Sequence, residues 1–421
     1  MGKKPAIRFE AYKGEWKQCN LSMIANKVFE KNTDLRYLET FTNSAEKGIV
    51  SQQDYFDHAI SKLESIAGYY VVNDNDFVYN PRISVTAPVG PINRNKLGRS
   101  GVMSPLYTVF SSHDIDPAYL EWYFKSAYWH PYMRLNGNTG ARYDRFSISD
   151  KMFFQMPIPT PDIEEQKLIA HHFEQLDLLI TLQQSNYEKM VVTKKSMLDK
   201  LFPQGAAKVP AIRFEGFVGD WEQHKFNDVF DFLQNNTLSR AELGNAQSKV
   251  MNIHYGDILV RYGAILDVKK DKLTYLLNDS LVKKYQTSLL RNGDIVIADA
   301  AEDETVGKCS EIAGLTDEEV LAGLHTIPCR PKGKFAEGFI GYYMNSNSYH
   351  DQLLPLIQGT KVSSVSKASI QDTYIVYPSS ELEQKQIADY LKSMDDLIEL
   401  YRIRVEKLKN IKAACLQGMF V

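Results

Sequence analysis

The chain has 421 residues, 44% of them hydrophobic and 24% charged, with a formal net charge of −3 at pH 7. This composition is ordinary for a soluble globular protein, and the length suggests two or three domains. No stretch approaches 18 apolar residues and no signal peptide opens the chain, so we expect a cytoplasmic protein with no membrane segment. Cys19, Cys309, Cys329 and Cys415 are scattered, which indicates isolated thiols rather than zinc ligands or disulfides.

Each half of the chain opens on the same short motif. The sequence PAIRFEAYKGEW starts at Pro5, and PAIRFEGFVGDW starts at Pro210, a shift of 205 positions (210 − 5). An internal repeat of this kind decides the domain organisation before any other feature does. We therefore expect two halves that begin alike.

The first variable region, residues 18–159, mixes strand and helix signals. Aromatic and β-branched runs predict strands at 69–72, 77–79 and 103–111. An aromatic-rich segment at 116–129 predicts a helix. This half is therefore expected to be α+β.

The second variable region, residues 225–378, has the same late order of elements but different residues. Apolar runs predict strands at 257–260, 294–297 and 324–329, and a helix at 336–345. A glycine-containing loop and a β run to a proline follow, as they do in the first half. The two regions thus share a plan around dissimilar inserts.

A second repeat closes each half. Residues 165–202 and 383–420 align at a shift of 218 positions (383 − 165), both starting Glu-Gln-Lys, with no Gly or Pro before their last two turns. Their apolar residues recur at alternating steps of four and three, which is a heptad pattern typical of a coiled coil. Each helix would be roughly 60 Å long. Packing of each helix on its own domain is the alternative, but the sustained heptad favours pairing of the two helices.

A polar, basic loop precedes each long helix, at 136–147 and at 358–366. Gly140 aligns with Gly359, and glycine permits a close backbone approach, while arginine, lysine and hydroxyl groups are the groups that meet phosphates and base edges. The alignment also pairs Arg142 with Lys361 and Ser147 with Ser366. For a single loop a solvated turn is the better interpretation, and the occurrence of two copies at the same place makes a binding site an equal alternative.

Charge is unevenly distributed along the variable regions. No acidic residue occurs from Phe77 to His113, a stretch that carries Arg82, Arg94, Lys96 and Arg99. In the second half, Arg261, Lys269 and Lys270 fall in a stretch richer in basic than in acidic residues. An acidic patch, Asp299 with Glu302, Asp303 and Glu304, is expected to be a solvated loop that faces away from any phosphate.

These paired motifs, loops and helices together resemble the specificity subunit of a type I restriction-modification system. The resemblance implies an α+β fold in which two pseudo-repeated target recognition domains are separated by two long helices that pair as an antiparallel coiled coil. The implied boundaries are 1–160 for the first recognition domain, 161–203 for the first spacer helix, 204–379 for the second domain and 380–421 for the second helix.

The family resemblance also implies a function and a set of partners. Each domain would read half of a bipartite site in double-stranded DNA, and the helices would fix the gap. Two modification (methyltransferase) subunits and two restriction subunits would supply the chemistry, so that S-adenosylmethionine, ATP and Mg are expected in those partners and no cofactor, metal or catalytic residue in this chain. The residues expected to contact DNA are Arg142, Tyr143, Arg145, Ser147, Arg94, Lys96, Arg99, Thr360, Lys361, Ser364, Ser366 and Arg261.

Two other classes of protein are alternatives to this interpretation. A catalytic chain is disfavoured because Asn80-Pro81-Arg82 lacks the second proline and aromatic of a methyltransferase motif, and the Gly before Lys308 belongs to no P-loop. A nuclease-like Pro-Asp…Glu-x-Lys at 161–167 is better explained as an acidic helix start. The remaining alternative is a coiled-coil adaptor that binds only proteins, from which DNA binding would distinguish this chain.

Overall fold

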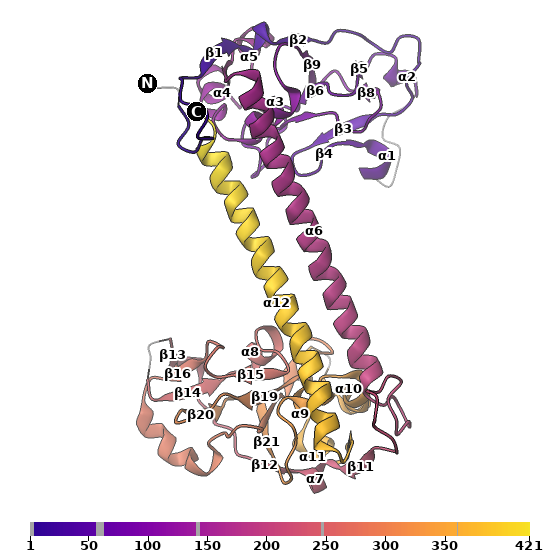
Figure 1. Cartoon of the computed structure of the whole chain (residues 1–421), viewed down its shortest axis with the longest axis vertical. Helices are drawn as coiled ribbons and strands as arrows, with labels where there is room; N and C mark the ends of the chain where they lie inside the picture. The colour runs from indigo at the N-terminus through magenta and orange to yellow at the C-terminus, as the bar shows by residue number, and fades with distance from the viewer. Residues whose placement is uncertain (1–3, 56–62, 140–143, 246–247, 360) are drawn as a thin grey trace. The chain divides into compact units, whose positions relative to one another are not determined.

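The computed structural model describes residues 4–55, 63–139, 144–245, 248–359 and 361–421 (Figure 1). The chain forms two compact units. Unit 1 comprises Met1–Gln184 and Ile403–Val421, and unit 2 comprises Ser185–Arg402. Two long helices, α6 (Ile163–Leu201) and α12 (Glu381–Gly418), each begin in one unit and end in the other. The predicted helices are therefore confirmed to within two residues at each end.

Unit 1 is built on an antiparallel sheet with the strand order β2-β9-β6-β7. Its strands are β2 (Ala25–Lys27), β9 (Thr108–Ser112), β6 (Phe77–Tyr79) and β7 (Ile92–Arg94). The two-stranded sheets are β1 (Lys17–Asn20) with β10 (Pro157–Thr160), β3 (Phe41–Ser44) with β4 (Gly48–Ser51), and β5 (Tyr70–Val72) with β8 (Gly101–Met103). The helices are α1 (Gln52–Tyr55), α2 (Leu63–Ile66), α3 (Pro117–Lys125), α4 (His130–Asn136) and α5 (Asp150–Phe154), with a short 3₁₀ turn at Leu21–Met23.

Helix α3 connects the sheet of unit 1 to the long helices. Asp116 caps the start of this helix, because its carboxylate accepts a hydrogen bond from Tyr119 N at 2.8 Å, and Pro117 occupies the first turn, where no donor is needed. Trp122 stacks on Phe173 of α6 at 4.8 Å between ring centroids. Phe420, which follows α12, also stacks on Phe173, at 5.9 Å between ring centroids. The core of unit 1 therefore contains side chains from both long helices.

Unit 2 contains a five-stranded sheet with the order β12-β21-β17-β19-β15 and a four-stranded sheet with the order β13-β16-β14-β20. The strands of the first are β12 (Phe230–Phe232), β21 (Thr326–Pro331), β17 (Ile295–Ala298), β19 (Cys309–Ala313) and β15 (Ile265–Asp267). Those of the second are β13 (Leu243–Gly244), β16 (Thr274–Leu276), β14 (Val250–Ile253) and β20 (Glu319–Ala322). Two further pairs are β11 (Glu222–Lys225) with β23 (Tyr374–Tyr377), and β18 (Ala300–Ala301) with β22 (Ser363–Ser364).

Short helices complete unit 2. They are α7 (Phe226–Val229), α8 (Tyr255–Val260), α9 (Phe339–Met344), α10 (Asn347–Leu353) and α11 (Lys367–Gln371), with 3₁₀ segments at Arg240–Glu242, Asp279–Ser288 and Leu354–Leu356. Phe202, at the end of α6, packs against Phe339 of α9 at 5.8 Å and Tyr343 at 5.6 Å. Unit 2 is thus closed by the end of α6, as unit 1 is closed by the end of α12.

The two units share one framework. Strands β2-β9-β6 of unit 1 and β12-β21-β17 of unit 2 have the same order and antiparallel sense. The pairing Lys17↔Thr160 in unit 1 has its counterpart in Glu222↔Tyr377. The predicted α+β plan, repeated in both halves, is confirmed. The division at 160, 203 and 379 stays a prediction, since the two compact units cut each long helix instead.

The long helices pair in antiparallel fashion inside unit 1. His172 of α6 lies against Cys415 of α12, with 3.6 Å between Nε2 and Sγ, and Asp177, further along α6, accepts a hydrogen bond from Lys412, which comes earlier in α12. In unit 2 the equivalent pair is Lys194 with Asp395, and this pair is the 218-residue repeat of the first.

Two predicted elements differ from the structure. Residues 257–260 form part of helix α8 and not a strand, because His254 Nδ1 accepts from Gly256 N at 3.1 Å and caps the helix. An apolar run of four residues has no periodicity that could tell a strand from a buried helix turn. The run 103–111 is interrupted by a turn in which Tyr107 N donates to Ser104 O at 3.0 Å, so it forms the end of β8 and the start of β9.

None of the helices in the described ranges is long and apolar enough to cross a membrane. Within the same ranges, no group of three or more His, Cys, Asp or Glu side chains is placed to hold a metal ion.

Candidate DNA interface

The two sequence repeats meet in each unit. Arg8 of the opening motif forms a double hydrogen bond with Glu165 at the start of α6, at 2.6 and 2.9 Å. Arg213 does the same with Glu383 at the start of α12, at 2.7 and 2.9 Å. Both glutamate side chains are 1% exposed. A planar guanidinium on a buried carboxylate fixes orientation as well as distance, so the opening motif is locked onto the helix in both units.

The glutamine that follows each of these glutamates ties two further segments together. Gln166 accepts from Asp116 N at 2.9 Å, just before α3, and donates to Pro161 O at 2.8 Å, just after β10. Gln384 accepts from Ala336 N at 3.0 Å and donates to Pro378 O at 2.8 Å. These bonds anchor the framework in the same way in both units. The segment between the two anchor points includes the predicted DNA loop.

In unit 1 the predicted loop is closed by a pair of backbone hydrogen bonds. Asn138 N donates to Ser147 O at 3.0 Å, and Ser147 N donates to Asn138 O at 2.7 Å. Ser147 is exposed and Arg145 is half-buried. Arg142 and Tyr143 lie outside the described residues. The two backbone bonds therefore fix the base of the loop.

In unit 2 the loop has the same closure at Gln358 and Ser364, with hydrogen bonds of 2.9 and 2.8 Å. Gly359 has φ +107°, and a Cβ there would lie 2.1 Å from Val362 O, so this turn requires glycine. Lys361 and Ser364 are exposed. Thr360 lies outside the described residues.

The structure corrects the alignment of the two loops. Ser147 and Ser364 both close the loop base, whereas Ser149 and Ser366 both cap the next helix. Ser149 Oγ accepts from Met152 N at 3.3 Å, and Ser366 Oγ accepts from Ser369 N at 3.0 Å. The predicted equivalence of Ser147 and Ser366 is therefore wrong, because the unit 2 loop is shorter. Ser366 uses its hydroxyl as a cap, and its contact with DNA stays a prediction.

Three predicted basic residues of unit 1 are held by carboxylates. Glu121, which is 3% exposed, forms ion pairs with Arg94 and Lys96 at 2.9 Å each and with Lys125 at 3.0 Å. Burial alone would raise the pKa of Glu121, but Lys125, Lys96 and Arg94 together bring it below its ordinary value. Arg99 forms a double hydrogen bond with Glu39 at 2.7 and 2.8 Å.

The predicted arginine of unit 2, Arg261, follows α8 and bonds to Asp257 at 3.1 Å, one turn earlier. Its side chain is 47% exposed. The side chain of Arg94 is only 10% exposed, so little of its guanidinium is accessible to DNA. Direct DNA contacts by Arg94, Lys96, Arg99 and Arg261 stay predictions, and each of these residues already has a structural partner.

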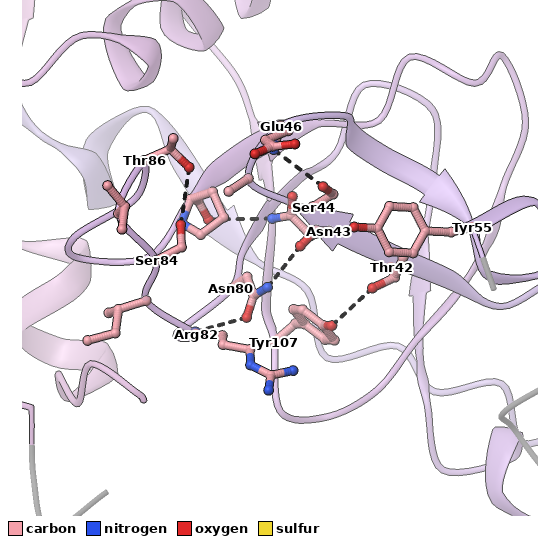
Figure 2. A pocket seen from close by; sticks show the side chains of 14 residues that line it. Thr42, Asn43, Ser44, Glu46, Tyr55, Asn80, Arg82, Ser84, Thr86 and Tyr107 are labelled. Carbon is pink, nitrogen blue, oxygen red and sulfur yellow. Dashed lines mark hydrogen bonds between the residues drawn. The ribbon is translucent and has the colours of Figure 1, made fainter. Parts of the chain in front are cut away.

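A polar hollow of about 500 Å³ in unit 1 was not predicted as a site (Figure 2). It is lined by the β3–β4 turn, the segment after β6 and Tyr107, and the polar side chains around it are Thr42, Asn43, Ser44, Glu46, Tyr55, Asn80, Arg82, Ser84, Thr86 and Tyr107. The sequence signal was the Asn80-Pro81-Arg82 run. That run lacks a complete catalytic motif, but it places Arg82 in the basic stretch that contains no acidic residue.

The neighbours of the two loops differ in charge. In unit 1 the loop pairs with the segment that carries Arg82, through the bridge Arg82↔Arg145. In unit 2 the loop pairs with Ala300 and Ala301, and the acidic residues 302–304 follow directly. The expectation that this acidic patch faces away from phosphate stays a prediction, but the patch begins beside the loop.

Comparison with known proteins agrees with the repeated framework. A family model, the type I restriction modification DNA specificity domain, matches residues 219–410. The MjaVIII type I restriction enzyme specificity subunit of Methanocaldococcus jannaschii is 28% identical over 275 residues, which are 63% of this chain and 61% of that subunit.

Solved structures share the fold along nearly the whole chain. The type I restriction-modification S subunit from M. genitalium matches with a TM-score of 0.55 at 13% identity, covering 99% of both chains. A chain from a study of complex assembly and conformational transition of the type I R-M system matches with a TM-score of 0.54 at 15% identity, covering 96% of this chain and 97% of that one. The chain is thus similar to type I restriction-modification specificity subunits in sequence over residues 219–410 and in fold along nearly its whole length.

Proposed function

We propose that this chain is the sequence-specific DNA-binding subunit of a type I restriction-modification complex and reads a bipartite site in double-stranded DNA. The observation that carries this proposal is one framework, repeated in both units, that presents two loops of different sequence at the same place, 138–147 and 358–364. A coiled-coil adaptor without DNA specificity would have no use for two differing loops. Lysine and arginine contacts to phosphate would position each unit, and contacts to base edges would read the sequence.

Exposed leucines at repeated positions of the long helices support the proposal that two copies of one partner bind this chain. Leu179 and Leu397 are equivalent in the 218-residue repeat and are 43% and 39% exposed; Leu182 and Leu400 are equivalent and are 52% and 40% exposed. Leucines exposed at repeated positions are candidates for a protein contact, and a surface that occurs twice fits a partner that binds twice. We infer that these leucines dock two modification subunits.

The chemistry of the complex would come from its partners. The modification subunits would bind S-adenosylmethionine and methylate adenine, and two restriction subunits would use ATP and Mg to cleave DNA. This chain would contribute binding and geometry, in the cytoplasm. We therefore expect no methyl transfer, cleavage or ATP hydrolysis by the purified chain. A radiolabelled methyl-transfer assay on DNA tests the first of these activities, and detectable transfer by the chain alone would contradict the proposal.

The test of DNA reading is competition binding by the complex of this chain with its modification subunits. DNAs altered in one half-site at a time should each bind more weakly than the cognate site. Lys361→Ala should weaken binding through the second half only, and should make the salt dependence shallower if lysine contacts phosphate. Equal binding to cognate and altered DNAs would overturn the proposal.

The docking of two modification subunits has a separate test. Leu179→Asp with Leu182→Asp should remove one modification subunit from the complex, and Leu397→Asp with Leu400→Asp should remove one as well, as measured by native mass spectrometry. Leu168→Asp is a matched control, because Leu168 is 43% exposed but its repeat position is Gln386. Loss of neither subunit, or loss of both from either pair, would contradict the assignment.

The long helices, of 39 and 38 residues, are proposed to set the gap between the half-sites. Inserting about two helical turns, or roughly seven residues, at matching places in both should lengthen the gap and leave the half-sites unchanged. Methylation mapping on DNA libraries with varied gaps measures this. A change in the bases that are read would contradict the role of the helices as spacers.

A further inference from the structure

Two arginines of unit 1 face each other across neighbouring backbone segments. Arg82 and Arg145 are antiparallel bridge partners. The hydrogen bonds on either side run from Phe146 N to Pro81 O at 2.7 Å and from Ile83 N to Asp144 O at 3.0 Å. This pattern makes Arg82 and Arg145 a non-hydrogen-bonded pair, whose side chains leave from the same face with Cβ atoms about 5 Å apart.

Like charges at such positions destabilise the pairing unless an anion compensates them. In the part of the chain that the structure describes, neither guanidinium forms an ion pair with a carboxylate. Three other arginines of unit 1 are compensated: Arg8 by Glu165, Arg94 by Glu121 and Arg99 by Glu39. The positive charges of Arg82 and Arg145 are therefore not compensated by carboxylates of the described residues, and both are available to an anionic ligand.

The side chain of Arg82 also lines the polar hollow described above (Figure 2). The amide of Asn80 beside it is already used, because its oxygen accepts from Arg82 N at 2.9 Å and its nitrogen donates to Asn43 O at 2.8 Å. The hydroxyls of Thr42 and Tyr107 lie 3.3 Å apart and share a hydrogen bond. Glu46, an acidic residue that lines the hollow, lies away from Arg82 in Figure 2. The strongest donor that remains at this edge is the Arg82 guanidinium.

We propose that Arg82 and Arg145 together bind one phosphodiester group of double-stranded DNA beside the first half-site. This inference rests on the proposed function and makes the pair a positioning device that does not read bases. Two adjacent guanidinium groups are best compensated by a full negative charge with several acceptor oxygens, which phosphate has and a base edge lacks. Where the unit 2 loop meets the neighbouring segment, the residues that lie opposite each other carry no charge: Ala300 pairs with Ser364 and Ala301 with Ser363.

The test measures affinity against salt for the complex of this chain with its modification subunits, on cognate DNA and on DNA altered in the first half-site. Arg82→Gln and Arg145→Gln should each weaken binding to both DNAs by the same factor, about tenfold, and should reduce the slope of log K against log salt by about 1. Arg82→Lys and Arg145→Lys should retain most of the slope. Arg36→Gln is the matched control and should leave the slope unchanged, because Arg36 is exposed, is paired with Asp34 at 3.0 Å and is not among the residues expected to contact DNA.

Each outcome decides one point. A loss confined to cognate DNA would show that the arginines read bases, and an unchanged salt slope in correctly folded variants would show that they contact no phosphate; either result overturns the inference. If the unaltered complex binds both DNAs equally while the variants lower the slope for both, the proposed sequence specificity fails and the phosphate contact stands. Thermal melting of each variant reports its folding, and the lysine variants serve where a glutamine variant does not fold.

Discussion

Asp76 in unit 1 and Asp294 in unit 2 occupy the same place in the repeated framework but differ in their partners. Each directly precedes a central strand, β6 or β17, and each accepts a hydrogen bond from the backbone N–H three residues earlier, at 2.7 Å from Asn73 and 2.8 Å from Arg291. They are 5% and 1% exposed. Asp294 forms a double hydrogen bond with Arg330 at 2.9 and 2.6 Å. Among the described residues, Asp76 has no cation within ion-pair distance.

The difference shows which features the repeat preserves. Backbone geometry is kept in both units, whereas charge compensation depends on residues of the variable strands. Ile295 pairs with Cys329 in unit 2, which places Asp294 opposite Arg330; Phe77 pairs with Phe110 in unit 1, which places Asp76 opposite Ser111. Burial therefore raises the pKa of Asp76 to about 6.

The largest effect is expected from removal of the cation in unit 2. Arg330→Met should destabilise unit 2 by about 3–5 kcal/mol, because it leaves the Asp294 carboxylate buried without a partner. Hydrogen exchange of β17 amides measures this locally. Arg261→Met is the matched control, since its pair with Asp257 is exposed and is expected to contribute about 0.5 kcal/mol or less. Equal effects of the two substitutions would contradict the comparison.

Unit 1 should instead respond to pH. The pKa of Asp76 is raised from 3.8 to about 6 in the folded state, so the stability linked to it is fully present below about pH 4 and is lost as the pH rises through about 6. Asp76→Asn should therefore stabilise unit 1 by up to roughly 3 kcal/mol at pH 8 and have little effect at pH 4. Exchange of β6 amides at both pH values provides the measurement. A pH-independent effect would show that Asp76 is charged throughout.

A designed counter-ion should give Asp76 of unit 1 the charge compensation that Asp294 has in unit 2. Ser111→Arg places a guanidinium at the position that Arg330 has in unit 2, and should bring the pKa of Asp76 back towards its ordinary value with a gain of about 1 kcal/mol at pH 8. NMR titration of the Asp76 carboxyl checks the direction. Ser112→Arg, one residue further along β9, is the control that should leave the titration unchanged.

The smallest expected difference concerns the two tryptophans of the opening motifs. Trp221 Nε1 donates to Glu383 at 3.3 Å, whereas Trp16 Nε1 has no hydrogen-bond partner in the described part of the chain. Both rings are 2% exposed. Trp221→Phe should therefore cost about 1 kcal/mol more than Trp16→Phe. Chemical unfolding of the two variants compares them, and an equal cost would mean that the bond to Glu383 contributes nothing.

Sequence reasoning located the long helices because a heptad without glycine or proline is a local signal, repeated over many turns. It could not place their neighbours. Arg82 lies beside Arg145 through pairing of segments far apart in the sequence, and the acid-free stretch around Arg94 and Arg99 proved to be neutralised by Glu121 and Glu39 from outside it. Counting basic residues along the chain therefore overestimates the charge that is free to bind DNA.

The loops show a second reason. Their position before each long helix was predictable, but the shorter loop of unit 2 shifted the alignment of its serines, and only the backbone bonds of Ser364 revealed this. The prediction of a strand at 257–260 was wrong because the run is too short to show a period, and the cap at His254 makes it helical. Local sequence patterns were thus enough to predict the framework, whereas the surface depends on pairing between segments far apart in the sequence and could not be predicted.

The exchange of helix ends has a consequence for biosynthesis. Unit 1 includes Ile403–Val421, and Phe420 stacks on Phe173 in its core, whereas every residue of unit 2 falls between Ser185 and Arg402. A ribosome therefore makes most of unit 1 first but delivers its closing segment only after all of unit 2. Unit 2 is the first to become complete, and the nascent unit 1 waits with the site of Phe420 unfilled until translation of the last helix ends, which reverses the usual N-terminal-first order of domain folding.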